Sequence, residues 1–260
     1  MLDMFLTAAA SAAPIPADPP LMPSGNWTVD WGYTNCLAIQ SYGDARNPTT
    51  FAFKPSIDGD VIRLTVSRKG PYQNASHFEL KVGDVKTTAL GFTPSKSGVE
   101  VFWINIPRAD FNRLAIEPAL AIKGGRLDLN LSTKGFAAAT AAINKCSTDL
   151  RALWNADEAG QARISVKPVA LISPWKLVKP EDYPDQAMFE GRNGTTTISL
   201  LVDDKGAVKD CVVELASGVA TLDAQTCLMI QQRGKFSPAK DAEGNPIKSR
   251  LSYRFRWKTN

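Results

Sequence analysis

The clearest pattern in the chain is its last stretch, Lys248-Ser-Arg-Leu-Ser-Tyr-Arg-Phe-Arg-Trp-Lys258. Its side chains alternate between an apolar or aromatic set and a polar or basic set. The first set is Leu251, Tyr253, Phe255 and Trp257, and the second is Arg250, Ser252, Arg254, Arg256 and Lys258. Because successive side chains of a strand point to opposite faces, the alternation predicts a β-strand with one packed face and one solvated face.

The residues before this strand predict a small α+β unit. The predicted elements are a helix over 185–190, strands over 195–202 and 208–216, a helix over 222–233 and the strand over 248–258. Pro184 suits the first position of the first helix. Between the first two strands, Asp203-Asp-Lys-Gly206 is typical of a hairpin turn, in which Gly206 can adopt a positive φ.

This order of elements, with Tyr183-Pro184 at its front, resembles the C-terminal domain of the TonB family. The matching residues are Tyr183-Pro184, Ala187, Gly191, Gly194, Val202-Asp-Asp-Lys-Gly206-Ala-Val208, Ser217-Gly218, Leu222-Asp223, Phe236-Ser-Pro238-Ala239 and Gly244-Asn-Pro246-Ile247. The resemblance covers about residues 180–258, under a third of the chain. It implies a domain that binds another protein through an exposed sheet edge and performs no catalysis.

Energy-transducing members of that family are anchored in the inner membrane and cross the periplasm on a rod rich in Pro and Lys. The longest uncharged apolar run here, Met4–Ala13, has ten residues, whereas a membrane-spanning helix needs about 20. We therefore expect a periplasmic protein that keeps the binding fold without a membrane anchor. The expected partner is a protein, either an outer-membrane transporter or another envelope protein.

If the last strand is an edge of its sheet, it is the expected docking site. The predicted binding residues are Arg250, Tyr253, Arg254 and Arg256. The arginines would favour acidic partners. The alternative interpretation is that these charges protect the edge against aggregation.

The chain contains four cysteines, Cys36, Cys146, Cys211 and Cys227, whose bonding state indicates the cellular compartment. None of them lies in a C-x-x-C pair. The economical one of three possible pairings joins Cys36 to Cys146 and Cys211 to Cys227, each bridge within one predicted domain. Disulfides are typical of an oxidising compartment; the alternative is four buried thiols in a cytosolic protein. With a single histidine, His77, the chain also lacks the common zinc spacings, so we expect no metal and no cofactor.

At 260 residues the chain is long enough for two domains. Residues 26–154 are predicted to form a β-rich domain closed by a helix. The predicted strands lie at 51–53, 60–67, 78–82, 99–104 and 127–131, and the helix begins at Phe136. Residues 155–182 are predicted to be a linker and residues 183–260 the TonB-like domain, which makes the fold class α+β.

Residues 1–25 are predicted to be a signal-like and Pro-rich leader. Ala10-Ser-Ala-Ala-Pro14 offers a pattern that a signal peptidase could cut, but no Lys or Arg precedes Arg46. Two interpretations follow: a signal peptide whose basic start is missing, or a flexible tail rich in Ala and Pro. Residues 14–25 contain five prolines and predict an extended segment that does not pack.

Other functions are weakly supported by the sequence. The net charge of +4 is modest, and no nucleic-acid-binding motif accompanies the basic last strand. Ser76 and His77 would point to opposite faces of a strand and make a poor nucleophile–base pair, so we expect no enzyme. The alternative function is a cell-wall-binding or inhibitor-type envelope protein. Its candidate aromatic residues are Trp27, Trp31, Tyr33 and Tyr42.

Overall fold

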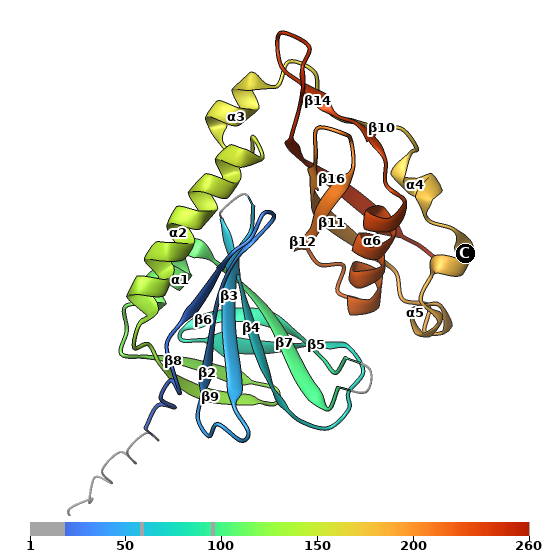
Figure 1. The fold of residues 1–260 in the computed structure, drawn as a ribbon. Coiled ribbons are helices and arrows are strands. Elements are labelled where there is room, and N and C mark those ends of the chain that lie inside the picture. The colour runs from blue at the N-terminus through green and yellow to red at the C-terminus, as the bar shows by residue number, and fades with distance from the viewer. Residues whose placement is uncertain (1–18, 58–59, 95–96, 260) are drawn as a thin grey trace, which may run out of the picture.

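The computed structural model describes residues 19–57, 60–94 and 97–259. The signal-like segment Met4–Ala13 lies outside the described residues. A strongly curled nine-stranded sheet is followed by a smaller, three-stranded sheet with helices on one of its faces (Figure 1). The fold class is mixed α+β, as predicted.

The nine-stranded sheet is antiparallel and has the order β1-β2-β3-β4-β7-β6-β5-β8-β9. Its strands are β1 (Thr28–Trp31), β2 (Cys36–Tyr42), β3 (Thr49–Pro55), β4 (Val61–Lys69), β5 (Ser76–Val82), β6 (Val85–Phe92), β7 (Val99–Pro107), β8 (Ala119–Gly124) and β9 (Leu127–Ser132). Strands β3, β4, β5, β7 and β9 correspond to predicted strands, whereas β1, β2, β6 and β8 were not predicted.

Residues 21–24 link β9, at one edge of this curled sheet, to β2, the second strand from its other edge. The amide of Leu21 donates to the carbonyl of Asn130, 2.7 Å away, and the amide of Ser24 donates to the carbonyl of Ser41 at 2.8 Å. Asn130 belongs to β9 and Ser41 to β2. The proline content predicted an unpacked segment here; these residues instead satisfy backbone groups of both strands.

Helix α2 (Phe136–Leu153) lies beside the curled sheet and contacts β1, β2 and β3 (Figure 1). Its buried side includes Phe136, Ile143 and Leu150, as the helical spacing predicts. Phe136 joins a cluster of rings with Trp27 and Phe53. A shorter helix, α1 (Arg108–Leu114), follows β7 and buries Phe111 and Leu114. The predicted disulfide between Cys36 and Cys146 is present and joins β2 to α2.

Residues 155–182 contain four short elements, namely α3 (Glu158–Arg163), β10 (Val169–Ala170), α4 (Pro174–Leu177) and the 3₁₀ helix η1 (Pro180–Asp182). Strand β10 pairs with β13 (Phe236–Ser237), so this segment runs beside the C-terminal part of the chain. The domain boundaries drawn from the sequence remain a prediction.

The C-terminal part follows the predicted order of helix, strand, strand, helix and strand. These elements are α5 (Asp185–Phe189), β11 (Gly194–Val202), β12 (Val208–Leu215), α6 (Ala220–Arg233) and β16 (Ser249–Trp257). The sheet order is β12-β11-β16, and β14 (Ala239–Lys240) pairs with β15 (Pro246–Ile247) in a small hairpin. The second predicted disulfide, Cys211–Cys227, is present and joins β12 to α6.

An ion pair holds the 3₁₀ helix η1 against α6. Arg233 donates to both carboxylate oxygens of Asp182, at 2.5 and 2.9 Å, and the amide of Lys179 donates to the same carboxylate at 2.8 Å. These hydrogen bonds stabilise the ionised carboxylate and lower the pKa of Asp182 from 3.8 to about 2. A group with a depressed pKa stabilises the fold above its ordinary pKa and loses that contribution as the pH falls towards 2.

We therefore expect Asp182→Asn to lower the free energy of unfolding by about 1–2 kcal/mol at pH 7. The difference from the wild type should shrink between pH 4 and pH 2, because the Asp182 carboxylate is protonated first in the unfolded chain and then, near its pKa of about 2, in the folded one. Urea denaturation at several pH values measures both quantities. The control is Glu181→Gln, which removes an exposed neighbouring charge; equal losses in the two variants would contradict the role of the ion pair.

Candidate protein-binding edge

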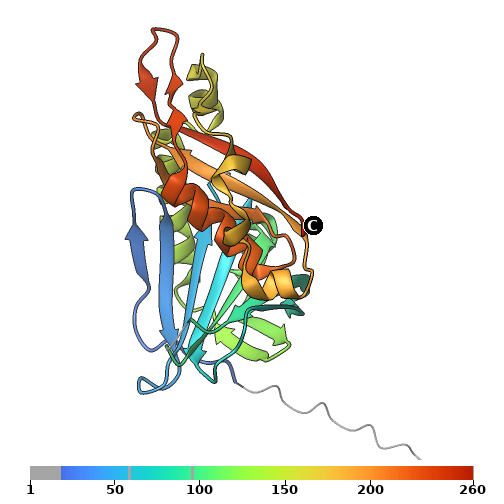
Figure 2. The same cartoon turned by 90° about the vertical axis from the view of Figure 1, so that its right-hand side faces the viewer.

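Strand β16 forms one edge of the C-terminal sheet. It pairs with β11 along its whole length, from Ser249 opposite Val202 to Trp257 opposite Gly194. Within the described part of the chain, no strand pairs with its other side. Figure 2 shows β16, in dark red, along the outer margin of the sheet. Such an edge presents unpaired N–H and C=O groups that an extended segment of another chain can pair with.

The apolar side chains of β16 point toward the helices, as the alternation predicted. Phe255 and Trp257 are buried, and the indole N–H of Trp257 donates to the hydroxyl of Thr226 at 2.9 Å. Tyr253 is half-buried on the same face, with its ring 6.0 Å from that of Phe236. Burial raises the pKa of Tyr253, and its hydroxyl hydrogen-bonds the backbone of Ala170. The predicted binding residue Tyr253 thus lies on the face opposite to the arginines.

The three predicted arginines share the outer face of β16 but differ in their surroundings. Arg254 and Arg256 are exposed, and neither forms a salt bridge with any residue that the structure describes. Arg250 is half-buried, pairs with Glu214 of β12 and donates from Nε to the hydroxyl of Ser199 at 2.9 Å. The exposed positive charge of this edge therefore lies toward its C-terminal end.

The outer face of the C-terminal sheet, which points away from its helices, is covered by the nine-stranded sheet at one end only. Leu201 of β11 is 3 % exposed and belongs to the hydrophobic core of the nine-stranded sheet. At the other end of β11, Thr195 and Thr197 are half-buried and lie opposite Arg256 and Arg254. A segment added to β16 would therefore meet these two arginines on its outer face.

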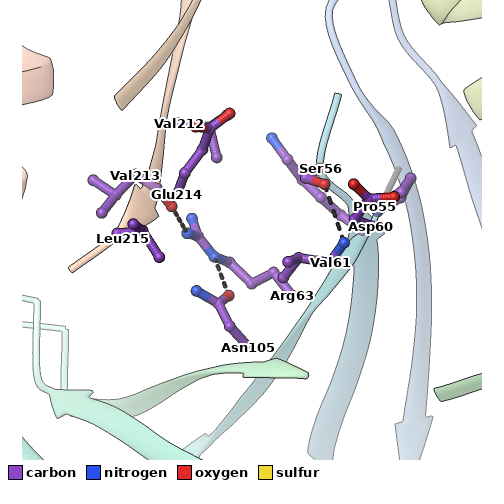
Figure 3. A pocket seen from close by; sticks show the side chains of 11 residues that line it. Pro55, Ser56, Asp60, Val61, Arg63, Asn105, Val212, Val213, Glu214 and Leu215 are labelled. Atoms are coloured by element: carbon purple, nitrogen blue, oxygen red, sulfur yellow. Dashed lines mark hydrogen bonds between the residues drawn. The ribbon is translucent and has the colours of Figure 1, made fainter. Parts of the chain in front are cut away.

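The opposite edge, β12, is held by side chains from the nine-stranded sheet. Arg63 of β4 donates from Nη2 to the carbonyl oxygen of Val213 at 3.0 Å, and from Nε to Asn105 at 3.1 Å (Figure 3). Lys54 lies 4.0 Å from the carboxylate of Asp210. Burial lowers the pKa of both cations, and Asp210 opposes the shift. Strand β12 thus has neighbours on both sides, whereas β16 is paired on one side only.

Sequence reasoning missed this arrangement at β12. Arg63 lies in a strand that alternates as expected, and its neighbours in the sequence contain no signal that its guanidinium would reach a residue 150 positions away. The same holds for Glu214. Its ion pair with Arg250 leaves that arginine, one of the predicted binding residues, half-buried.

The residues considered for other functions lie elsewhere. His77 is half-buried in β5 opposite Leu90, and among the described residues no group of His, Cys, Asp or Glu side chains could hold a metal ion. Of the four aromatic residues considered for cell-wall binding, Tyr42 is fully buried and Trp27 packs on the core. Trp31 and Tyr33 are about half exposed, at 49 and 53 %.

Comparison with known proteins confirms the resemblance seen in the sequence. Residues 179–259 match the family model of the Gram-negative bacterial TonB protein C-terminal domain. The matched segment begins just before η1 and includes every strand of the C-terminal sheet. Domains of this family are non-enzymatic and mediate protein interactions in the cell envelope. No curated protein matches the chain. Among the described helices, none has the length and apolar character needed to span a bilayer.

Proposed function

We propose that this chain, whose residues 179–259 form a TonB C-terminal domain, is a periplasmic protein that binds an envelope protein by strand addition at β16. The observation that carries the proposal is the state of the two sheet edges. Strand β12 is engaged by Arg63 and Lys54, while β16 has no second neighbour among the described strands.

In strand addition at β16, backbone hydrogen bonds would supply the affinity and side chains would supply the selectivity. Alternate residues of β16 (Ser249–Trp257) direct their backbone N–H and C=O groups away from β11, and these groups can supply main-chain hydrogen bonds to an extended partner of any sequence. Selectivity then comes from side chains at alternate positions of the partner. Those beside Arg254 and Arg256 would be acidic, because both guanidinium groups lack a carboxylate partner among the described residues.

The two disulfides support a periplasmic location, since structural disulfides persist in oxidising compartments. TonB-type domains also act in the periplasm, where they engage envelope proteins. The partner we propose is an outer-membrane transporter or another envelope protein that offers an extended acidic segment. The nine-stranded sheet would restrict pairing to β16, because its side chains hold β12.

Charge reversal at the edge tests the proposal. A photocrosslinking amino acid at Ser252, an exposed position of β16, should capture a periplasmic protein in living cells. We expect Arg254→Glu with Arg256→Glu to reduce the yield of that crosslink about tenfold, because charge complementarity becomes repulsion. The measurement is quantitative mass spectrometry of the crosslinked product.

The matched control is Lys235→Glu with Lys240→Glu, which makes the same change in net charge at two exposed positions outside β16. This control should leave the crosslink unchanged. Undiminished capture by the Arg254→Glu and Arg256→Glu chain would remove these arginines from the binding site. Capture that is equally strong when the crosslinker stands at Glu243, in the exposed β14–β15 turn, would count against pairing at β16.

A further inference from the structure

A largely apolar cleft lies between the nine-stranded sheet and the C-terminal sheet, on the side away from β16. Its volume is about 660 Å³. One wall consists of Leu90, Phe92 and Trp103, on strands β6 and β7. The other wall consists of Ala220, Ala224 and Leu228, on helix α6. Ligand sites for small molecules have volumes of roughly 300–1,000 Å³ and mainly apolar linings, so this cleft has the size and lining of such a site.

The two walls differ in shape. The first is aromatic: Trp103 is 38 % exposed, and its ring meets that of Phe92 edge-on at 4.9 Å. The second is flat over Ala220 and Ala224, whose side chains are short, and Leu228 stands one turn further along α6. The disulfide Cys211–Cys227 lines the cleft and joins α6 to β12, which fixes the position of this wall. A slot between an aromatic wall and a flat wall suits a planar ring system.

The cleft contains few ionisable groups. Its lining has one guanidinium, Arg63, one carboxylate, Asp223, and one imidazole, His77. Arg63 is hydrogen-bonded to Asn105 and Val213 and lies over the ring of Trp103, 5.3 Å from its centroid. Oδ1 of Asp223 accepts from the hydroxyl of Thr196 at 2.6 Å and from the amide of Ser217 at 2.8 Å, whereas its Oδ2 is buried without a hydrogen-bond partner among the described residues. An anionic ligand would therefore enter beside a carboxylate and without an available counter-charge, because Arg63 is already engaged, and this is costly in an apolar site.

We infer that this cleft binds a mainly apolar small molecule that carries a planar ring system and no negative charge. Polar groups of the ligand would be met by the polar side chains of the lining, His77, Thr88, Asn105, Thr221 and Gln231, and a hydrogen-bond donor by Oδ2 of Asp223. This site is separate from the protein-binding edge, because it is formed by β12 and α6 rather than by β16.

The experiment uses a matched pair of fluorescent probes on the full chain. N-phenyl-1-naphthylamine is neutral and contains a planar naphthalene ring, and 8-anilinonaphthalene-1-sulfonate has the same rings with one added negative charge. We expect one molecule of the neutral probe to bind saturably, and the sulfonate to bind at least tenfold more weakly. Absence of saturable binding of the neutral probe would overturn the inference, and equal affinity for the two probes would overturn the assignment of a ligand without negative charge.

Two variants locate the site. Ala224→Trp fills the cleft from an exposed position of α6, and Trp103→Ala removes its aromatic wall. Each should weaken binding of the neutral probe at least tenfold. The control is Phe189→Ala, which removes an apolar side chain that is 93 % exposed outside the cleft and should leave binding unchanged. Circular dichroism and thermal unfolding establish that each variant is folded.

If Ala224→Trp leaves the affinity unchanged while the chain is folded, the probe binds elsewhere and the cleft is not the site. The same variant should retain crosslinking from Ser252, because it does not touch β16. Loss of probe binding with retained crosslinking therefore supports the cleft independently of the proposed function.

Discussion

A chain carrying Cys36→Ser and Cys146→Ser is expected to lose about 4–5 kcal/mol of its free energy of unfolding, because the bridge closes a loop of about 110 residues. In the chain-entropy account, the bridge stabilises the fold by restricting the unfolded chain, and the restriction grows with loop length. Both cysteines are buried, at 1 and 0 % exposed, so the native bridge adds no exposed surface.

The comparison that tests this explanation is the second bridge. Cys211–Cys227 spans a sequence separation of 16 residues, so replacing both cysteines with Ser should cost about 3 kcal/mol. Urea denaturation followed by circular dichroism gives both losses under non-reducing conditions. A larger loss from the shorter loop would show that packing around each bridge, rather than loop length, decides its contribution.

The second large effect is expected at Gly206 in the β11–β12 hairpin. Gly206 has φ of +80°, and a Cβ atom there would overlap the backbone carbonyl of Phe236. The amide of Phe236 donates to the carbonyl of Gly206 at 3.0 Å, so the hairpin and the segment that enters β13 are in direct contact. Gly206→Ala combines about 1–2 kcal/mol of left-handed backbone strain with about 1–3 kcal/mol for the steric overlap.

We therefore expect Gly206→Ala to lower the free energy of unfolding by about 3 kcal/mol. Gly244→Ala is the matched control, because Gly244 has φ of +85° but no atom within 4 Å of the position of its Cβ. Its loss should be limited to the backbone strain of about 1–2 kcal/mol. Equal losses in the two variants, measured by urea denaturation, would contradict a close contact between the hairpin and Phe236.

Much of the C-terminal part is local in origin and could be predicted. The alternation of β16 and the glycine of the hairpin each depend on neighbours within a few positions. The predicted bounds of β16, 248–258, differ from Ser249–Trp257 by one residue at each end. The pairing of the cysteines also followed from their positions, since each bridge joins elements of one predicted domain.

Two of the missed strands, β2 and β6, have polar residues where an apolar pattern is expected. In β2 the buried side contains Gln40, which is 4 % exposed and whose amide donates to the carbonyl of Gly25 at 2.7 Å. In β6 the hydroxyl of Thr87 donates to the carbonyl of Asn105 at 2.9 Å. These polar groups are tolerated because distant backbone atoms satisfy them, and no neighbour in the sequence signals such a partner.

The sequence by itself determined the elements of the TonB-type domain, its two-faced last strand and its disulfide-bonded cysteines, because these depend on local periodicity, turn chemistry and residue type. Only the tertiary structure decided which sheet edge is open and where the cleft lies. Both depend on Arg63 and Val213, which are 150 positions apart and meet only when the two sheets pack. The folded arrangement of the two sheets therefore sets what the chain can bind.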